Sequence, residues 1–336
     1  MTQDVYALPL VRLDPDRPSG ALPLAGGWGW FDRVRLIARD GAPRVVAAQG
    51  LPADLQDRLA APRADLCGLT LDRPRVMGIV NVTPDSFSDG GRFHDPAAGI
   101  AHGRALIAAG ADLLDIGGES TRPGAEDVPP EAEAARVVPV IAGLAGLAPI
   151  SVDTRKAGVA GPALDAGAGI VNDVAGLSFD PALAPLVAFR DVPVCIMHHQ
   201  GTPATMQADP RYDDVLLDVY DWLAAAVAKA EAAGIARHRI LIDPGIGFGK
   251  TQAHNLTLLR NIALFHGLGL PILLGVSRKR FIGAIGGAEA ADARGPGTLA
   301  VTLAAVAQGV QIHRVHDVDQ ISQGLRLWQA IQGGKE

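Results

Sequence analysis

Eight short apolar runs recur between residues 76 and 315, and longer amphipathic or alanine-rich stretches separate them. The runs are residues 76–82, 113–117, 150–153, 170–173, 194–197, 240–243, 272–275 and 312–315. Such runs are typical of strands that are buried on both faces. Strands that alternate with helices pair in parallel through right-handed crossovers. Eight of them predict an α/β fold, the (β/α)₈ or TIM barrel, which usually takes about 250 residues.

A doubly wound open sheet is the competing fold for this pattern. In that fold the ligand-binding residues gather at one switch point of the strand order. Here polar residues follow nearly every apolar run, as Asn81, Asp153 and Asp243 illustrate. This distribution favours the barrel, because all eight strands then bring their carboxyl ends to one mouth, where active sites of this fold lie.

Two of the intervening stretches carry clear helix boundaries. Asp95 and Pro96 suit the N-cap and the first turn of a helix, and Gly110 ends that helix. Residues 213–233 have apolar side chains at helical spacing, and Gly234 follows them as a stop signal.

The first 64 residues differ from the rest and are predicted to be an N-terminal extension of mixed structure. They are rich in Pro and Gly, with strand-like runs at 34–37 and 45–47 and a possible short helix at 53–60. The sequence assigns no function to them. The predicted organisation is therefore residues 1–64 as the extension and residues 65–336 as the catalytic barrel.

Composition excludes several classes of function. The net charge of −6 leaves no basic footprint for nucleic acid. No apolar run approaches the roughly 18 residues of a membrane span, and the N-terminus lacks the pattern of a secretory signal. Two cysteines, Cys67 and Cys195, lack metal-ligand or redox spacing and indicate a reducing compartment. We expect a cytoplasmic protein without nucleic-acid or membrane partners.

Two local motifs resemble functional sites but fail on detail. Residues 244–251 resemble a phosphate loop, yet Pro244 stands where its first Gly is required, and Lys250 replaces the third Gly of a dinucleotide motif. His198 and His199 are adjacent, and His313 and His316 lack a carboxylate partner pattern. Neither pair has the spacing of a zinc site.

Eight motifs, taken in order, resemble the blocks of the dihydropteroate synthase family of pterin-binding barrels. They are residues 81–91 (NVTPDSFSDGG), 115–124 (DIGGESTRPG), 151–154 (SVDT), 171–173 (VND), 197–198 (MH), 243–250 (DPGIGFGK), 277–279 (SRK) and 314–318 (RVHDV). The resemblance implies an enzyme of folate synthesis. Such an enzyme joins 4-aminobenzoate to 6-hydroxymethyl-7,8-dihydropterin diphosphate and releases pyrophosphate.

The resemblance also implies roles for the polar residues of the mouth. Asp243 would present two acceptors to the N–H groups of the pterin edge, a charge-assisted bidentate pair. Asp153 and Asn172 would meet other ring nitrogens, and Lys279 would donate to the ring carbonyl and N5. These four are the expected catalytic residues. Other expected contacts of the pterin diphosphate are Thr121, Met197, Phe248, Gly275, Arg314 and His316, of which Arg314 and His316 would hold the diphosphate.

Magnesium is the implied cofactor, with Asn81 as its protein ligand, since Mg²⁺ takes oxygen ligands and keeps several waters. The two loops 83–91 and 118–124 would close over the site and shape the aminobenzoate pocket. Its expected residues are Phe87, Thr121, Arg122, Pro123 and Ser277. Phe87 has an alternative role as a structural anchor of its loop.

Loss of pyrophosphate would leave a pterin-methyl cation, so an SN1-like path is expected, with fixed carboxylates stabilising the charge, Asp153 above all. Two alternative functions remain: a pterin-dependent corrinoid methyltransferase, and a pterin-binding protein without activity. The first has no use for a diphosphate clamp or the STRPG loop. Residues 297–309 form an alanine-rich helix that suits either a homodimer contact or packing within the chain, and a homodimer is expected from the resemblance.

Overall fold

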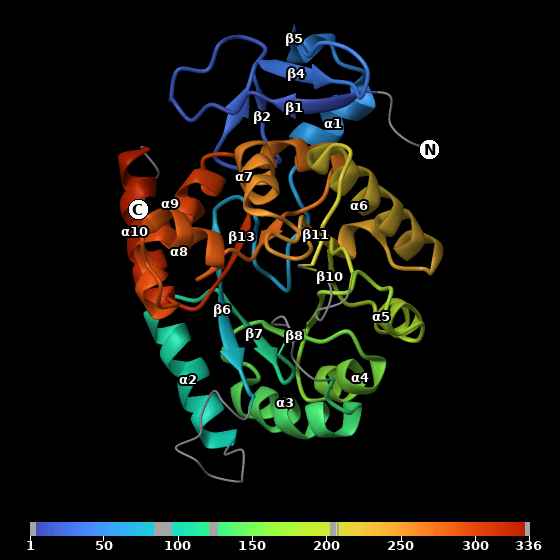
Figure 1. Cartoon of the computed structure of the whole chain (residues 1–336), viewed down its shortest axis with the longest axis vertical. Coiled ribbons are helices and arrows are strands. Elements are labelled where there is room, and N and C mark those ends of the chain that lie inside the picture. Colours follow the sequence, from blue (N-terminus) through green and yellow to red (C-terminus); the bar gives the residue numbers. More distant parts are fainter. Residues whose placement is uncertain (1–4, 84–95, 121–126, 202–205, 207, 333–336) are drawn as a thin grey trace.

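The computed structural model describes residues 5–83, 96–120, 127–201, 206 and 208–332, and its larger part is a barrel of eight parallel strands (Figure 1). The strands are β6(Arg75–Asn81), β7(Leu113–Gly117), β8(Ile150–Asp153), β9(Ile170–Asp173), β10(Val194–Met197), β11(Ile240–Asp243), β12(Leu273–Leu274) and β13(Ile312–Val315). Consecutive strands from β6 to β11 pair in parallel, and β13 pairs with both β12 and β6. A parallel bridge between Ile242 and Ile272 joins β11 to the segment before β12, so the sheet closes. The predicted barrel fold is confirmed.

One strand is shorter than the sequence predicts. Residues 272–275 were expected to form a strand, but β12 covers only Leu273–Leu274. Pro271, just before it, has no N–H to donate to a neighbouring strand, and Gly275 lacks a side chain that favours extended structure. Gly275 therefore lies just beyond the strand, at the mouth.

Helices surround the barrel and alternate with its strands (Figure 1). They are α2(Pro96–Ala109), α3(Pro130–Leu144), α4(Ala157–Asp165), α5(Leu183–Arg190), α6(Val215–Ala232), α7(Gln252–Arg260), α8(Arg280–Gly286), α9(Gly295–Val306) and α10(Val318–Ile331), with short 3₁₀ turns η2(Arg237–Arg239), η3(Ile262–Leu268) and η4(Asp292–Arg294). Asp214 caps α6 by accepting from the N–H groups of Leu216 and Leu217. Gly234 follows α6 at φ +95°, a conformation that glycine adopts without strain. Among the described residues, no helix combines the length and the apolar character of a bilayer span.

The barrel interior is divided into an apolar lower half and a polar upper half. Side chains alternate between inside and outside along each strand. At the amino ends of the strands, the inward positions form one apolar cluster, whose barrel members are Met77, Leu113, Ile170, Cys195, Leu241, Leu273 and Ile312. Leu66 and Leu71 close this cluster from below. We call this cluster the lower layer, and Cys195 is one of its buried members.

Residues before the barrel form a separate small sheet. Its strands are β1(Tyr6–Pro9), β4(Arg33–Ile37) and β5(Arg44–Ala47), in the order β1-β4-β5 and antiparallel, beside the two-residue pair β2(Leu22–Pro23) and β3(Trp30–Phe31). The 3₁₀ turn η1(Ala48–Gly50) leads into α1(Ala53–Ala60). The strands and the helix predicted in this stretch are thus present. They share a small apolar core that includes Ala7, Phe31, Val34 and Leu59.

The small sheet lies against the base of the barrel, the end where the strands begin (Figure 1). The Trp28 indole donates to the carbonyl of Val306, 2.8 Å away, at the end of α9. Arg58 and Arg63 donate to the carbonyls of Gly267 and His266 in η3. Arg63 is 7% exposed. These contacts fix the small sheet on the face opposite the mouth.

Candidate active site

The centre of the mouth is an ion cluster around Arg314, an inward residue of β13. Its Nε donates to Asp115 Oδ2 at 2.5 Å, and its Nη2 donates to Asp153 Oδ2 at 2.6 Å. Asn172 Nδ2 donates to the same Asp115 oxygen at 3.0 Å. Four side chains from β7, β8, β9 and β13 therefore meet inside the barrel.

Asp115 is a member of this cluster to which sequence reasoning gave no role. It is fully buried, and its Oδ1 has no hydrogen-bond partner among the described residues. The sequence did contain an indication: Asp115 alternates with Leu113 and Gly117 along β7, so the three residues face the same side of the strand. Its partners lie 57 and 199 residues away in the sequence.

Burial controls the charge state of Asp153. Removal from water raises the pKa of Asp153 from 3.8 to about 7, and the nearby Asp115 adds to the rise, while Arg314 opposes it. The two carboxylates in turn raise the pKa of Arg314, which stays charged. A carboxylate that ionises near neutral pH inside a mouth is a frequent mark of an active site.

Asp243, at the end of β11, combines a turn with an open acceptor. Its Oδ1 accepts from the N–H of Gly245 at 2.7 Å. Gly245 has φ +67°, and a Cβ there would lie 1.8 Å from the carbonyl oxygen of His198, so only glycine is accommodated. Burial raises the pKa of Asp243, and Lys279 opposes the rise. A Cβ on Gly275 would lie 3.8 Å from Oδ2, so Gly275 keeps that side of the carboxylate open.

Lys279 faces Asp243 from the next strand end. Its Nζ donates to the carbonyl of Ile246 and lies 4.5 Å from the ring centroid of Phe248, a cation–π contact. Burial lowers the pKa of Lys279 from 10.5 to about 8, and Asp243 opposes the fall. The lysine therefore changes charge within about two pH units of neutrality.

Ser277 and His316 form a second polar pair on the rim. Ser277 Oγ accepts from the backbone N–H of His316 at 3.1 Å and lies 2.9 Å from His316 Nδ1. The neighbouring Arg278 forms a two-contact ion pair with Asp317. The structure thus brings Ser277, His316 and Arg314 to one side of the mouth.

A buried ion network joins Glu119, which follows β7, to Val128, which precedes α3. Lys156 Nζ donates to Glu119 Oε1, to Glu133 Oε2 and to the carbonyl of Val128, each at 2.7 Å. Glu119 also accepts from the N–H of Val128 at 2.9 Å and from Arg155. Glu119, Glu133, Arg155 and Lys156 thus form one group of charged side chains. Sequence reasoning missed this group, because its members become neighbours only when β7 and β8 pair.

Lys250, in the motif 244–251, makes three contacts within the protein through its ammonium group. Its Nζ lies 2.8 Å from His198 Nδ1 and donates to the carbonyls of Gly245 and Phe248. The lysine is 3% exposed. It stabilises the turn that follows Asp243.

Of the remaining predicted site residues, Met197 is buried at the end of β10, and Asn81 is half-buried at the end of β6. Phe87, Thr121, Arg122 and Pro123 lie outside the described residues. Within the described ranges, no three His, Cys, Asp or Glu side chains converge as a metal-binding group.

A closed α/β barrel with buried carboxylates, an amide, a lysine and an arginine in its mouth defines a class of barrel enzymes that bind a small polar ligand. The family model described as "Pterin binding enzyme" matches residues 77–316, the greater part of the chain. The class is therefore that of the pterin-binding barrel enzymes.

The relatives define the family more narrowly. A dihydropteroate synthase of Neisseria meningitidis serogroup C is 50% identical over 265 residues, which are 78% of this chain and 94% of the relative. A solved Xanthomonas albilineans dihydropteroate synthase with 4-aminobenzoic acid has a TM-score of 0.76 at 50% identity, covering 82% of this chain and 99% of the other. A Yersinia pestis dihydropteroate synthase in a sulfonamide drug complex has a TM-score of 0.75 at 43% identity, covering 79% and 97%. The chain belongs to the dihydropteroate synthase family, transferases of folate synthesis.

Proposed function

We propose that the mouth condenses 6-hydroxymethyl-7,8-dihydropterin diphosphate with 4-aminobenzoate to give 7,8-dihydropteroate and pyrophosphate. The single observation that carries this proposal is the close match to dihydropteroate synthases over 94% of a relative's length. The polar cluster in the mouth supports it, because the reaction needs side chains that hydrogen-bond to the pterin ring and side chains that bind the diphosphate. A corrinoid methyltransferase is not favoured by these relatives.

The pterin ring is proposed to lie between Asp243, Asn172 and Lys279. Asp243 offers its Oδ2 beside Gly275 to the N–H groups of the ring edge. Asp153 and Asn172 read other ring nitrogens, and Lys279 donates to the ring carbonyl and N5. Met197 and Phe248 supply apolar contact with the ring. The donors and acceptors of these polar side chains are complementary to those of an aminopyrimidinone.

The diphosphate is proposed to lie against Arg314 and His316. In Arg314, the N–H of Nε and one N–H of Nη2 donate to carboxylates, which leaves the second N–H of Nη2 and both of Nη1 as donors toward phosphate oxygens. Asn81, half-buried at the end of β6, has the hard amide oxygen that Mg²⁺ accepts as a ligand, with waters and diphosphate oxygens as the others. Bound magnesium would neutralise the charge of the diphosphate.

An SN1-like path is proposed for the bond cleavage. As pyrophosphate leaves, positive charge spreads from the methylene carbon into the ring, and the carboxylates of Asp153 and Asp115 face that ring. A preorganised negative charge in a site removed from water stabilises such a cation strongly. The amine of 4-aminobenzoate then attacks, with Ser277, Phe87, Thr121, Arg122 and Pro123 proposed as its pocket.

The test is a turnover assay on the purified full-length chain with both substrates and magnesium. We expect 7,8-dihydropteroate and pyrophosphate in equal amounts, and inhibition by a sulfonamide that competes with 4-aminobenzoate. A folded sample that binds the pterin substrate but makes no product would support the inactive-protein alternative and overturn the proposal.

The whole active site is proposed to lie within residues 65–336. The protein is proposed to be cytoplasmic and to act as a homodimer. Leu327 and Ile331 on α10 are 64% and 71% exposed, and they support an apolar contact between copies. Light scattering on the purified chain tests the dimer. A chain that starts near Arg63 tests the boundary: it should keep its KM values and lose stability, because Trp28 and Arg58 no longer contact the base.

A further inference from the structure

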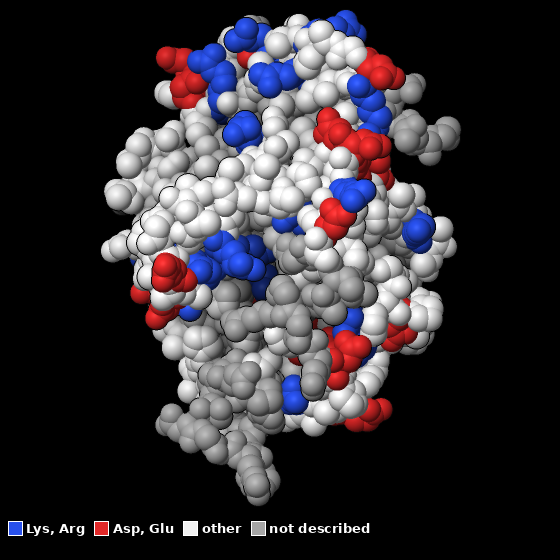
Figure 2. Space-filling model, viewed as in Figure 1, with Lys and Arg blue, Asp and Glu red and all other residues white. Residues whose placement is uncertain are grey.

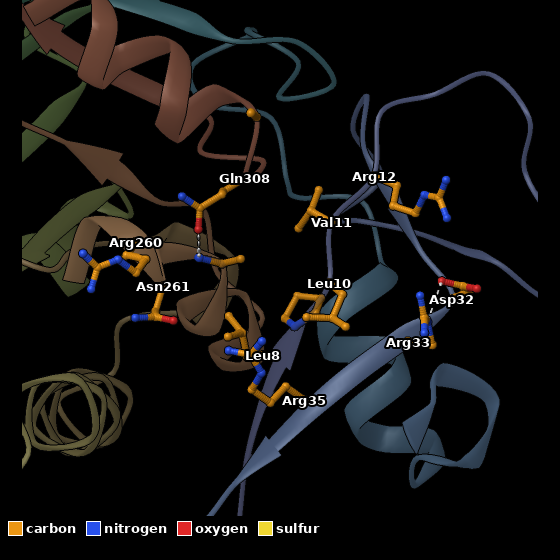
Figure 3. A pocket seen from close by; sticks show the side chains of 13 residues that line it. Leu8, Leu10, Val11, Arg12, Asp32, Arg33, Arg35, Arg260, Asn261 and Gln308 are labelled. Atoms are coloured by element: carbon orange, nitrogen blue, oxygen red, sulfur yellow. Dashed lines mark hydrogen bonds and ion pairs between the residues drawn. The ribbon is translucent and has the colours of Figure 1, made fainter. Parts of the chain in front are cut away.

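A hollow of about 540 Å³ lies between the small sheet and the base of the barrel (Figure 3). One wall is β1 with the residues after it, together with β4, and the other consists of the end of α7, the start of η3 and the turn after α9. Helix-to-strand connections lie at the base of a (β/α)₈ barrel, opposite the mouth. The hollow is therefore separate from the candidate active site, and its volume lies within the usual range of about 300–1,000 Å³ for ligand pockets.

Arginines surround this hollow from both walls. Arg12, Arg33 and Arg35 belong to the small sheet and Arg260 to the end of α7, while Asp32 is the one acidic residue among those that line it (Figure 3). At the end of the molecule that carries the small sheet, at the top of the view, Figure 2 shows Lys and Arg side chains interspersed with Asp and Glu side chains, and the net charge of the whole chain is −6. The excess of arginine over acidic residues is thus a local feature of the lining of the hollow, which we call the basic rim.

Two of these arginines lack a carboxylate partner within the described ranges. Arg12 is paired with Asp14 at 3.0 Å, and Arg33 reaches Asp32 only at 4.0 Å. Neither Arg35 nor Arg260 lies within 4 Å of a described carboxylate. Their guanidinium groups are available to an external anion, and guanidinium binds phosphate oxygens in a bidentate manner.

The floor of the hollow is apolar and held in place. Leu8, Leu10 and Val11 lie between the arginines (Figure 3). The Gln308 side chain beside them is fully engaged, since its Nε2 donates to the carbonyl of Leu259 and its Oε1 accepts from the N–H of Ala263. An apolar floor below a basic rim suits a ligand with an organic body and several anionic oxygens.

We propose that this hollow binds a small organic polyphosphate, with its organic body on Leu10 and Val11 and its phosphates on Arg35 and Arg260. The proposal concerns a second site of the enzyme, which takes no part in the condensation. Binding there stabilises the contact between the small sheet and the base, because the ligand touches both.

The experiment is isothermal titration of the full-length chain with ATP, inorganic tripolyphosphate and adenosine at constant ionic strength. Each titration is repeated with saturating 7,8-dihydropteroate in the mouth. The test variant is R35Q/R260Q. The control is R104Q/R326Q, which removes the same charge from exposed arginines on α2 and α10 that do not line the hollow. Thermal melting checks that both variants are folded.

We expect ATP to bind with a Kd below about 1 mM, tighter than tripolyphosphate or adenosine alone, and unaffected by the occupied mouth. R35Q/R260Q should weaken ATP at least about tenfold with unchanged turnover, while R104Q/R326Q stays within about twofold. Absence of ATP binding would overturn the proposal. Equal loss of ATP affinity in both variants would show a non-specific charge effect and would also overturn the proposal. If 7,8-dihydropteroate displaces ATP, the ATP binds in the mouth and not in the hollow.

Discussion

The lower and upper halves of the barrel interior belong to one eight-stranded sheet and serve opposite purposes. Below, the inward side chains are Met77, Leu113, Ile170, Cys195, Leu241, Leu273 and Ile312. Above, the inward side chains of the same sheet include Asp115, Asp153, Asn172, Asp243 and Arg314. One residue along a strand separates Leu113 from Asp115, Ile170 from Asn172, and Ile312 from Arg314.

This difference shows how one fold divides stability from chemistry. Burial of the lower layer is favourable and needs no partner beyond close packing. The upper layer holds charges that burial disfavours, as the raised pKa of Asp153 and the lowered pKa of Lys279 show. Such groups persist because each faces a charge of opposite sign, and they remain poised for a ligand that completes the pairing.

Removal of the shared cation should have the largest effect. Arg314→Met leaves Asp115 and Asp153 buried without their counter-charge, so we expect a loss of about 3–5 kcal/mol in the free energy of unfolding. Turnover should fall by orders of magnitude, since the proposed diphosphate contact is lost as well. Urea unfolding and a turnover assay measure the two effects. Near-wild-type stability would mean that the carboxylates of the upper layer do not depend on Arg314.

The corresponding change in the lower layer should affect stability alone. Leu113→Ala removes a fully buried side chain and should cost about 2–5 kcal/mol. Both KM values should stay within about twofold at a temperature where the variant is folded, because the lower layer lies at the amino ends of the strands, away from the mouth. A large rise in the KM of the pterin substrate would show that the two halves are coupled.

Asp243→Asn separates the two uses of one side chain. The amide oxygen still accepts from Gly245, so the turn and the melting temperature should be preserved. Pterin affinity should fall at least about tenfold, because a charge-assisted contact worth about 1.5–3 kcal/mol is lost and an NH₂ group meets ring donors. Calorimetric titration with the pterin measures this change. Wild-type affinity in the variant would restrict Asp243 to the turn.

The pH dependence should show the smallest but most specific effect. Asp153 must be ionised to stabilise the cation, so kcat/KM should rise through about pH 7. Lys279 must be protonated to donate fully, so kcat/KM should fall above about pH 8. A bell-shaped profile follows, and Lys279→Arg should lack its alkaline limb. A value of kcat/KM that stays constant from about pH 6 to about pH 9 would contradict both assignments.

The free energy of unfolding should also depend on the ionisation of Asp153, but it should fall with rising pH where kcat/KM rises. The native state keeps the Asp153 proton up to about pH 7, whereas an unfolded Asp loses it near 3.8. The native state binds more protons over that interval, so this carboxyl makes the free energy of unfolding decrease as pH rises from 3.8 to 7. Asp153→Asn lacks this contribution, and urea unfolding of both proteins at a series of pH values measures the difference.

Local sequence determined the elements and most of the residues that face the mouth. The run at 150–153 ends on Asp153 and that at 240–243 ends on Asp243, as the strands do. Apolar runs of strand length and glycines such as Gly234 act over a few residues, so they are legible in one stretch of chain. The ordered motifs were enough to predict the family.

Only the tertiary structure decided which side chains share a contact. Arg314 meets Asp115 across 199 residues of sequence, and Lys156 meets Glu119 across 37. The hollow at the base joins Arg35 to Arg260, which no local pattern relates. These contacts depend on barrel closure and on how the small sheet lies against the base. Burial, and with it the pKa of Asp153 and Lys279, exists only after all eight strands have closed, because removal from water is a property of the whole interior.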